Sequence, residues 1–303
     1  MPSQLNAIAI CMLAGLIATA QPPSDSLAPP SNPALEIMNR MAANMDSATE
    51  ARRQYVYQQK VKARLIRTNG QVARQEDHEY TATPQAEHTV KQLVSFNGEY
   101  HKSKKEIIKY TEPGYKKGGM DIDGELIEDL VKSLVNDEKS RDGIPHSMFP
   151  LMAKDLPHYK FTLMEPTTHK GRSAYRIAFE PVTQTTRCLN FGGDDDDDCN
   201  SRPWKGEVLV DAEDLQPIHI ATDLTFKMPW GVKVFLGTNL RQTGFSVSYL
   251  RVAPNVWFPS TYGTEFKLDL LFGYKRVITL ALDSSEFKKT STSSEVKFQI
   301  EDH

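Results

Sequence analysis

The sequence is dominated by short segments in which apolar and polar residues alternate with a period of two. One face of the first segment carries Tyr55, Tyr57, Gln59, Val61, Ala63 and Leu65, and the other carries Lys60, Lys62 and Arg64. Similar segments continue to about residue 282, and only one helical stretch interrupts them. Because helix-length patterns do not separate the segments, they predict a mainly β protein with one large curved antiparallel sheet or half-open β-barrel.

Short polar turns separate the predicted strands. Asn69-Gly70 ends the first strand, and residues 71–81 return to form a hairpin. A third strand over about 88–96 is predicted to end at Asn97-Gly98. Further turns are predicted at His169-Lys170-Gly171 and at Arg241-Gln242-Thr243-Gly244.

Helices are predicted at two places. Leu35, Met38, Met41, Ala42 and Met45 recur at helical spacing, which predicts an amphipathic helix over 34–48 that begins after Asn32-Pro33. Asp121 is predicted to cap a second helix, and a further short helix follows Pro145, so a helical insertion spans about 120–156. Without an internal repeat, residues 35–303 are expected to form a single domain.

The N-terminal residues differ in composition from the rest. Ala7 to Ala20 is an uncharged apolar run that ends in Ala18-Thr19-Ala20, the pattern of a secretory signal cleaved after Ala20. Residues 1–20 are therefore predicted to be a signal peptide, 21–34 a proline-rich leader, and the mature protein periplasmic or secreted. The n-region has no Lys or Arg, and the alternative is a frayed apolar N-terminus.

Cysteine usage is consistent with export. Cys11 falls in the predicted signal, and Cys188 and Cys199 are separated by ten residues rich in Gly and Asp. This spacing predicts a disulfide that closes a long hairpin loop in an oxidising compartment. Two unpaired thiols are the alternative.

Charge and hydropathy argue against two classes of protein, nucleic-acid-binding proteins and membrane-spanning proteins. The 36 Lys and Arg residues against 39 Asp and Glu give a net charge of -3, so nucleic acid is not an expected partner. The mean hydropathy of -0.47 and the absence of a long apolar run predict no membrane-spanning segment in the mature chain. Lys102, Lys104 and Lys105 form a basic concentration that could contact an anionic headgroup or an acidic partner, or could simply protect an edge strand.

Two motifs carry a resemblance to a known family. They are Trp204-Lys-Gly-Glu-Val-Leu-Val-Asp211, continuing to Pro217-Ile-His-Ile, and Asn255-Val-Trp257-Phe-Pro259. This pattern is similar to the LolA-like outer-membrane lipoprotein-sorting proteins, and the order of helix, hairpin, insertion and β-rich half matches theirs over most of the chain. The resemblance implies a non-enzymatic periplasmic carrier that holds an acyl chain of a lipid or lipoprotein in a half-barrel, with helices as a lid and an envelope protein as a further partner. The long insertion and the cysteine loop depart from the family pattern.

The alternating strands also indicate an apolar cavity. Its expected floor consists of Ile218, Ile220, Leu224, Phe226, Phe266, Leu268, Leu270 and Phe272. Met148, Phe149 and Met152 are the expected lid, because methionine adapts to variable apolar shapes. The alternative is that the same residues form an ordinary filled core.

No motif predicts catalysis, a cofactor or a metal. The chain lacks the hydrolase, zinc-protease and nucleotide-binding signatures. The Asp194–Asp198 run is interpreted as a solvated tip rather than a calcium loop, and His78, His88 and His101 are interpreted as solvent-facing strand positions. Two alternative functions stay open: a non-catalytic envelope scaffold, and a carbohydrate-active hydrolase with paired carboxylates.

Overall fold

The computed structural model describes residues 32–85, 88–103, 105–135, 151–182, 204–224, 239–269 and 273–290. For Ser133, Leu224 and residues 239–243 it describes the backbone alone. The predicted signal peptide, the Cys188 and Cys199 pair and the Asp194–Asp198 run lie outside these ranges, as does most of the leader. The chain from Asn32 onward is one compact unit.

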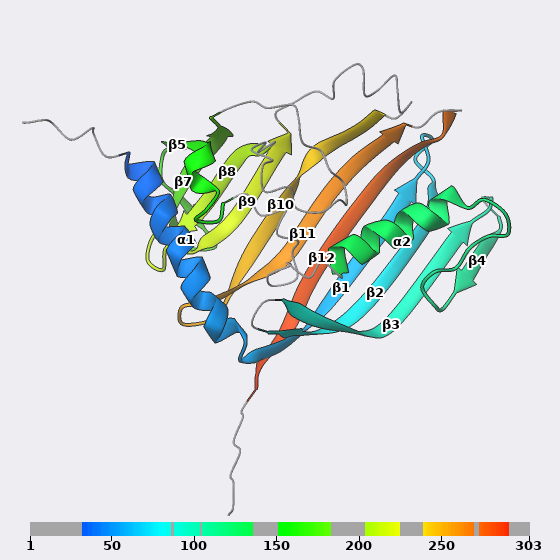
Figure 1. Ribbon diagram of the computed structural model, residues 1–303, viewed down its shortest axis with the longest axis horizontal. Coiled ribbons are helices and arrows are strands. Elements are labelled where there is room, and N and C mark those ends of the chain that lie inside the picture. Colours follow the sequence, from blue (N-terminus) through cyan, green and yellow to red (C-terminus); the bar gives the residue numbers. More distant parts are fainter. Residues whose placement is uncertain are drawn as a thin grey trace, which may run out of the picture. The chain divides into compact units, whose positions relative to one another are not determined.

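The described residues form one antiparallel sheet of 12 strands, which confirms the predicted fold class. The sheet order is β4-β3-β2-β1-β12-β11-β10-β9-β8-β7-β5, with β6 also paired to β7, so the sheet is open (Figure 1). The strands are β1 (Tyr55–Ile66), β2 (Val72–Pro84), β3 (Thr89–His101), β4 (Ile107–Tyr110), β5 (Tyr159–Leu163), β6 (Thr167–His169), β7 (Arg172–Pro181), β8 (Trp204–Asp211), β9 (Pro217–Leu224), β10 (Asn239–Ala253), β11 (Val256–Asp269) and β12 (Lys275–Lys289).

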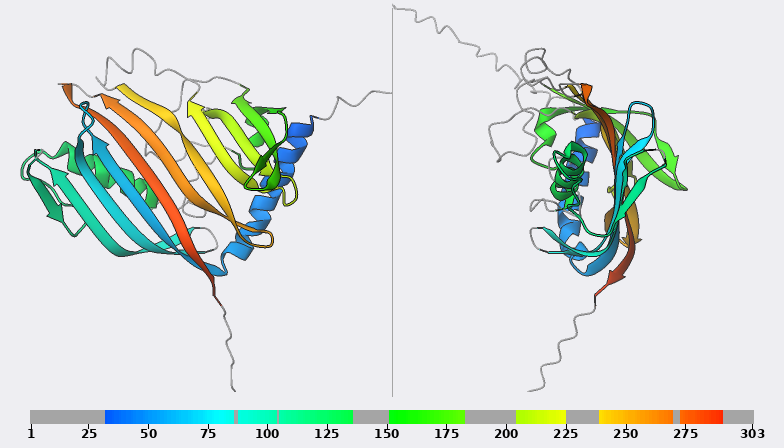
Figure 2. Two further views of the ribbon diagram at one scale, coloured as in Figure 1. Left: turned by 180° about the vertical axis from the view of Figure 1, so that it is seen from behind. Right: turned by 90° about the vertical axis from the view of Figure 1, so that its right-hand side faces the viewer.

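Helices cover one face of this sheet. Helix α1 (Pro33–Arg52) begins after Asn32, whose side chain accepts hydrogen bonds from two backbone N–H groups of its first turn. It packs against β5 and β11, whereas α2 (Ile122–Val135) packs against β1 and β2. Both helices lie on the same, concave side of the curved sheet (Figure 2). No helix in the described part of the chain is long and apolar enough to cross a membrane.

The core lies between the sheet and these helices. On β1 the burial alternates as the sequence predicts, with Val61, Ala63 and Leu65 facing the helices and Lys60, Lys62 and Arg64 facing outward. Both helices contribute side chains to the main core cluster. Helix α1 contributes Met38, Met41 and Ala42, and helix α2 contributes Ile127, Val131 and Leu134. The two helices therefore share one continuous apolar layer with the sheet.

Several predicted turns are confirmed. Gly70 has a φ of 80° at the β1–β2 turn, and Lys170 and Gly171, with φ of 49° and 82°, form a two-residue turn between β6 and β7. Asp121 caps α2 by accepting a hydrogen bond from the backbone N–H of Gly124 at 3.0 Å. Helix α1 continues past the predicted residue 48 to Arg52, and Ala48 and Arg52 are buried.

Two predicted turns are wrong, and both errors involve a glycine. Strand β10 continues through Arg241–Gly244 with a register shift at Gly244, where a Cβ would lie 1.8 Å from the carbonyl oxygen of Thr222 on the neighbouring strand. Strand β3 likewise continues past Asn97-Gly98 to His101, and a Cβ on Gly98 would lie 2.1 Å from the ring of Tyr110. Each glycine permits a close approach rather than a change of chain direction.

Candidate functional site: the concave face of the sheet

An apolar row crosses the concave face from one strand to the next. Successive register partners place one inward side chain from each of six strands in this row. We call this row the apolar floor, and it consists of Ile177, Val208, Ile220, Val247, Tyr262 and Leu282. All six are buried; α1 packs against β5 and against β11 of this row, and α2 packs against β1 and β2 beside it.

The structure places four of the predicted floor residues on this face. Ile218, Ile220, Phe266 and Leu268 have exposed fractions of 4%, 0%, 5% and 8% and belong to the same core cluster as Met38 of α1. For Leu224 only the backbone is described, and it pairs with Trp204. The other predicted floor residues, Phe226, Leu270 and Phe272, lie outside the described ranges.

Of the predicted lid, Met152 alone is described, since Met148 and Phe149 lie outside the described ranges. Met152 occupies a turn that leads into a short 3-10 helix, Leu156–His158, rather than a helix of its own. Together with Thr49 and Glu50 of α1 it lines a groove of about 520 Å³. The lid role of this segment therefore remains a prediction.

The apolar character of the concave face ends at β2. There the inward positions carry four ionisable side chains, which we call the polar stripe: Arg74, Glu76, His78 and Tyr80. Their exposed fractions are 0%, 3%, 4% and 7%. The sequence-based placement of His78 on the solvent face is therefore wrong, whereas His88 is exposed and His101 is partly exposed beside Glu99.

Hydrogen bonds connect the polar stripe. His78 Nε2 lies 3.0 Å from Glu76 Oε2, and Tyr80 Oη lies 3.0 Å from His78 Nδ1. Tyr110 donates to Glu76 Oε1 at 2.8 Å. Burial, with the nearby Glu76 carboxylate adding to it, raises the pKa of Tyr80 to about 12 and that of Tyr110 further, so both phenols stay protonated donors.

The polar stripe also attaches α2 to the sheet. Arg74 Nη2 donates to Asp121 Oδ2 at 2.9 Å, and Asp121 is the residue that caps the helix. Arg276 of β12 makes a bidentate pair with Asp123, both distances being 2.9 Å, and Tyr274 also donates to Asp123. Two buried or partly buried ion pairs thus fix the first turn of the helix.

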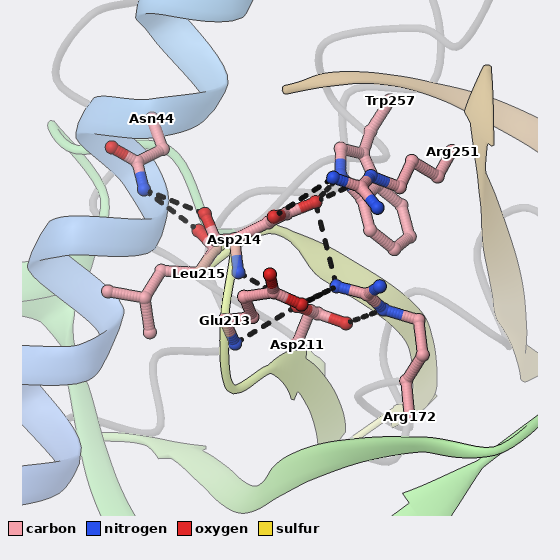
Figure 3. Close-up of polar contacts among 8 residues, drawn as sticks. All are labelled: Asn44, Arg172, Asp211, Glu213, Asp214, Leu215, Arg251 and Trp257. Atoms are coloured by element: carbon pink, nitrogen blue, oxygen red, sulfur yellow. Dashed lines mark hydrogen bonds and ion pairs between the residues drawn. The ribbon is translucent and has the colours of Figure 1, made fainter. Parts of the chain in front are cut away.

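A second polar cluster lies at the α1 end of the sheet (Figure 3). We call it the turn cluster, because it is built around the β8–β9 turn; its members are Asn44, Arg172, Asp211, Glu213, Asp214, Leu215, Arg251 and Trp257. The Trp257 indole donates to Asp214 at 2.9 Å, and Arg251 pairs with the same carboxylate oxygen. The two sequence motifs that carry the family resemblance therefore meet in space.

The hydrogen bonds of the turn cluster stabilise the β8–β9 turn and attach α1 to it. Arg172 donates to both oxygens of Asp211, at 2.5 and 2.8 Å, and the backbone N–H groups of Glu213 and Asp214 also donate to it. Burial opposes ionisation, but these hydrogen bonds outweigh it and lower the pKa of Asp211. Asn44 of α1 donates to the carbonyls of Asp214 and Leu215, which ties the helix to the turn.

The same cluster contains three neighbouring carboxylates, the residue type that can bind a metal ion. Asp211, Glu213 and Asp214 each offer a carboxylate oxygen within 4.8 Å of the others. However, the Asp211 oxygens already accept from a guanidinium and from backbone N–H groups, and Asp214 accepts from Arg251 and Trp257. Arginine supplies the positive charge that a cation would otherwise provide, so the arrangement is explained without a metal.

The predicted basic residues lie at the opposite edge of the sheet. Lys102 and Lys105 are exposed at the β3–β4 connection, and Lys104 lies outside the described ranges. Lys102 pairs with Glu106 at 2.8 Å, and this hydrogen bond raises its pKa. On the neighbouring segment Lys116 pairs with Glu128 of α2. These contacts fit lysines at an exposed edge.

Comparison with known proteins gives distant structural similarities. No family model and no curated protein matches the sequence. Among solved structures, a domain assigned as an outer membrane lipoprotein-sorting protein from Vibrio parahaemolyticus matches at 10% identity and a TM-score of 0.33, covering 85% of this chain and 95% of its own. A LolA superfamily protein from Nitrosomonas europaea matches at 10% identity and 0.31, covering 84% and 94%.

A DUF1329 family protein from Desulfovibrio piger also matches, at 10% identity and a TM-score of 0.36, over 86% of this chain and 95% of its own. At these identities and TM-scores the likeness is remote.

Proposed function

We propose that the protein is a non-enzymatic carrier that holds an acyl chain of a lipid or lipoprotein against the apolar floor. The observation that carries this proposal is the apolar floor itself, which crosses six strands of an open sheet. Its six side chains are buried, so an acyl chain reaches them when the segments that cover them move aside. Each buried CH₂ group contributes about 0.8 kcal/mol, so an ordinary acyl chain has enough binding free energy without a charged contact.

Adjacent residues of β11 provide a matched test. Leu268 faces the core with an exposed fraction of 8%, and Lys267 is exposed on the other face. Leu268→Asp introduces an unpaired charge into the concave face and is expected to abolish binding of a fluorescent fatty-acyl probe. Lys267→Asp places the same carboxylate on the outer face, where it replaces a solvent-exposed cation, and this variant is expected to bind as the wild type does.

Two outcomes contradict the carrier function. If the wild type binds no acyl probe while circular dichroism shows intact β structure, the carrier function is wrong and the scaffold alternative is favoured. If Leu268→Asp is folded and binds the probe unchanged, the ligand does not lie on the concave face. Native mass spectrometry of protein from its own host would identify a co-purified lipid.

The proposed compartment is the periplasm or the exterior, after cleavage near Ala20. The apolar Ala7–Ala20 run and the Cys188 and Cys199 pair support it. Exposed Lys102 and Lys105 offer a contact for an anionic headgroup or an acidic envelope partner. N-terminal sequencing of the protein from its host should begin at Gln21, and a mature chain that retains residues 1–20 would contradict export by this signal.

A further inference from the structure

A polar pair interrupts the concave face in the middle of β1. Gln59 has an exposed fraction of 0% and Ser284 of 4%, and Gln59 Nε2 donates to Ser284 Oγ at 3.2 Å. The register pairs Gln59 with Ser284 on β12 and with Tyr80 on β2. Val61 follows two residues later on the same face and pairs with Leu282 of the apolar floor. The pair therefore lies directly beside the floor.

The Gln59 side chain is only half satisfied. Its Oε1 atom is buried and has no hydrogen-bond partner. Turning the amide over exchanges the two atoms and leaves the Nε2 group without an acceptor instead. A buried polar group without a partner destabilises the folded state, so a leucine of similar size would stabilise this position better. Fold stability alone does not explain a glutamine here.

Other buried hydroxyls on the same face differ from Gln59. Thr264 donates to the carbonyl of Gly244, and Thr222 bonds to both the N–H and the C=O of Phe245. These two threonines provide hydrogen-bond partners for backbone groups of β10 at Gly244 and Phe245. The β10–β11 register shifts at Gly244. Gln59 also lies beside an irregularity, since the β1–β12 register shifts between Val56 and Gln58, but its side chain donates to the Ser284 hydroxyl rather than to a backbone group.

We propose that Gln59 and Ser284 bind the hydrogen-bonding linkage at the head of the acyl chain, an ester or an amide. This inference rests on the carrier function proposed above and adds the chemistry of the ligand head. With the amide as found, Oε1 accepts from an N–H or O–H of the ligand. With the amide turned over, Nε2 donates to the ligand carbonyl while Oε1 accepts from the Ser284 hydroxyl. The tail then extends from Val61 and Leu282 along the apolar floor.

The test compares Gln59→Leu with Gln58→Leu. Gln58 is the adjacent residue on the opposite face of β1, where its side chain bonds to Thr81. Three probes of equal chain length compete with a fluorescent acyl probe: a fatty amide, a monoacylglycerol and a plain alkane. Wild type is expected to bind the amide or the ester more tightly than the alkane, and the better of the two identifies the linkage.

Gln59→Leu is expected to weaken binding of that probe by about fivefold or more, as the loss of one buried hydrogen bond predicts, and to leave alkane binding unchanged. Its Tm without ligand should equal or exceed that of the wild type. Gln58→Leu should leave all three affinities unchanged. Ser284→Ala, a smaller change, should weaken the same probe as Gln59→Leu does.

The outcomes separate this inference from the carrier function. If wild type binds all three probes equally, or Gln59→Leu keeps the full preference, the head-group site is wrong and the carrier function stands. A large loss of Tm in both Gln59→Leu and Ser284→Ala would show a structural role and also overturn the site. If wild type binds none of the probes, the carrier function itself fails.

Discussion

The two ends of the sheet hold their helices by different physical means. Beneath α2, the inward positions of β2 are the ionisable Arg74, Glu76 and His78, and ion pairs fix the start of the helix. Beneath α1, core side chains such as Met38 and Met41 face the sheet, Arg52 at the end of the helix donates to the carbonyl of Trp257, and further charged groups gather in the turn cluster at the rim. One sheet therefore combines a directional polar attachment with an adaptable apolar one.

The difference suggests distinct roles for the two helices. Buried ion pairs contribute little net stability, but separating the two partners leaves a buried charge uncompensated, which is costly. Any shift of α2 that separates these pairs is therefore unfavourable, and the pairs hold the helix in one position. Apolar side chains can exchange one neighbour for another at small cost, and methionine does so most readily. The end beneath α1 is therefore better suited to adjust around a ligand, and the end beneath α2 to keep the helix in place.

The largest effect is expected from Arg74→Met. Arg74 is fully buried, and its removal leaves Asp121 as a buried carboxylate without its ion-pair partner. We expect a loss of about 3 to 5 kcal/mol in the free energy of unfolding, measured by urea denaturation. The double variant Arg74→Met with Asp121→Asn, which keeps a capping side chain, should recover much of the loss. A small effect of the single variant would show that ion pairing does not hold α2.

An intermediate effect is expected from Asp211→Asn in the turn cluster. The change weakens charge-assisted hydrogen bonds from Arg172, and it should cost about 1.5 to 3 kcal/mol at neutral pH. Because the pKa of Asp211 is lowered in the folded state, its stabilisation is present above the ordinary aspartate pKa of 3.8 and is lost as the pH falls below it. Urea titrations across acid pH should show this loss in the wild type and a smaller one in the variant.

The smallest effect is expected from Ile220→Val on the apolar floor. Ile220 has no exposed surface, and loss of one methylene there should cost about 0.5 to 1.5 kcal/mol. If the apolar packing around Ile220 can readjust, the loss of unfolding free energy should fall in the lower part of that range. A cost above that of Asp211→Asn in the same urea assay would reverse the comparison and indicate rigid packing at the floor.

The sequence predicts the apolar parts of this fold better than the polar ones. In β1 the apolar and charged residues alternate cleanly, so the buried face could be identified, and the capping role of Asp121 followed from the pattern after it. In β2 both faces are polar, since Arg74, Glu76 and His78 alternate with Gln75, Asp77 and Glu79. Hydropathy cannot assign an inside to such a strand, and the polar stripe was missed.

Long-range pairing limited the prediction of the site as well. The buried Gln59 side chain is paired with Ser284, which comes from a strand far away in the sequence. No local sequence pattern predicts this pairing. Gly98 and Gly244 were interpreted as turn residues because the neighbours that require a glycine, Tyr110 and Thr222, come from other strands. A pairing signal between positions distant in the sequence would have corrected all three.

The pairing of β1 with β12 determines when the protein can finish folding. Gln59 and Ser284 are 225 positions apart, and β1 occupies a central position in the sheet between β2 and β12. The β1–β2 hairpin can form early from local contacts, but it lacks its second neighbour until almost the whole chain is available. Closing so long a loop is slow, and the exposed edge of β1 is open to other strands meanwhile. Shielding this edge until β12 is available would therefore protect the folding chain from association with other strands.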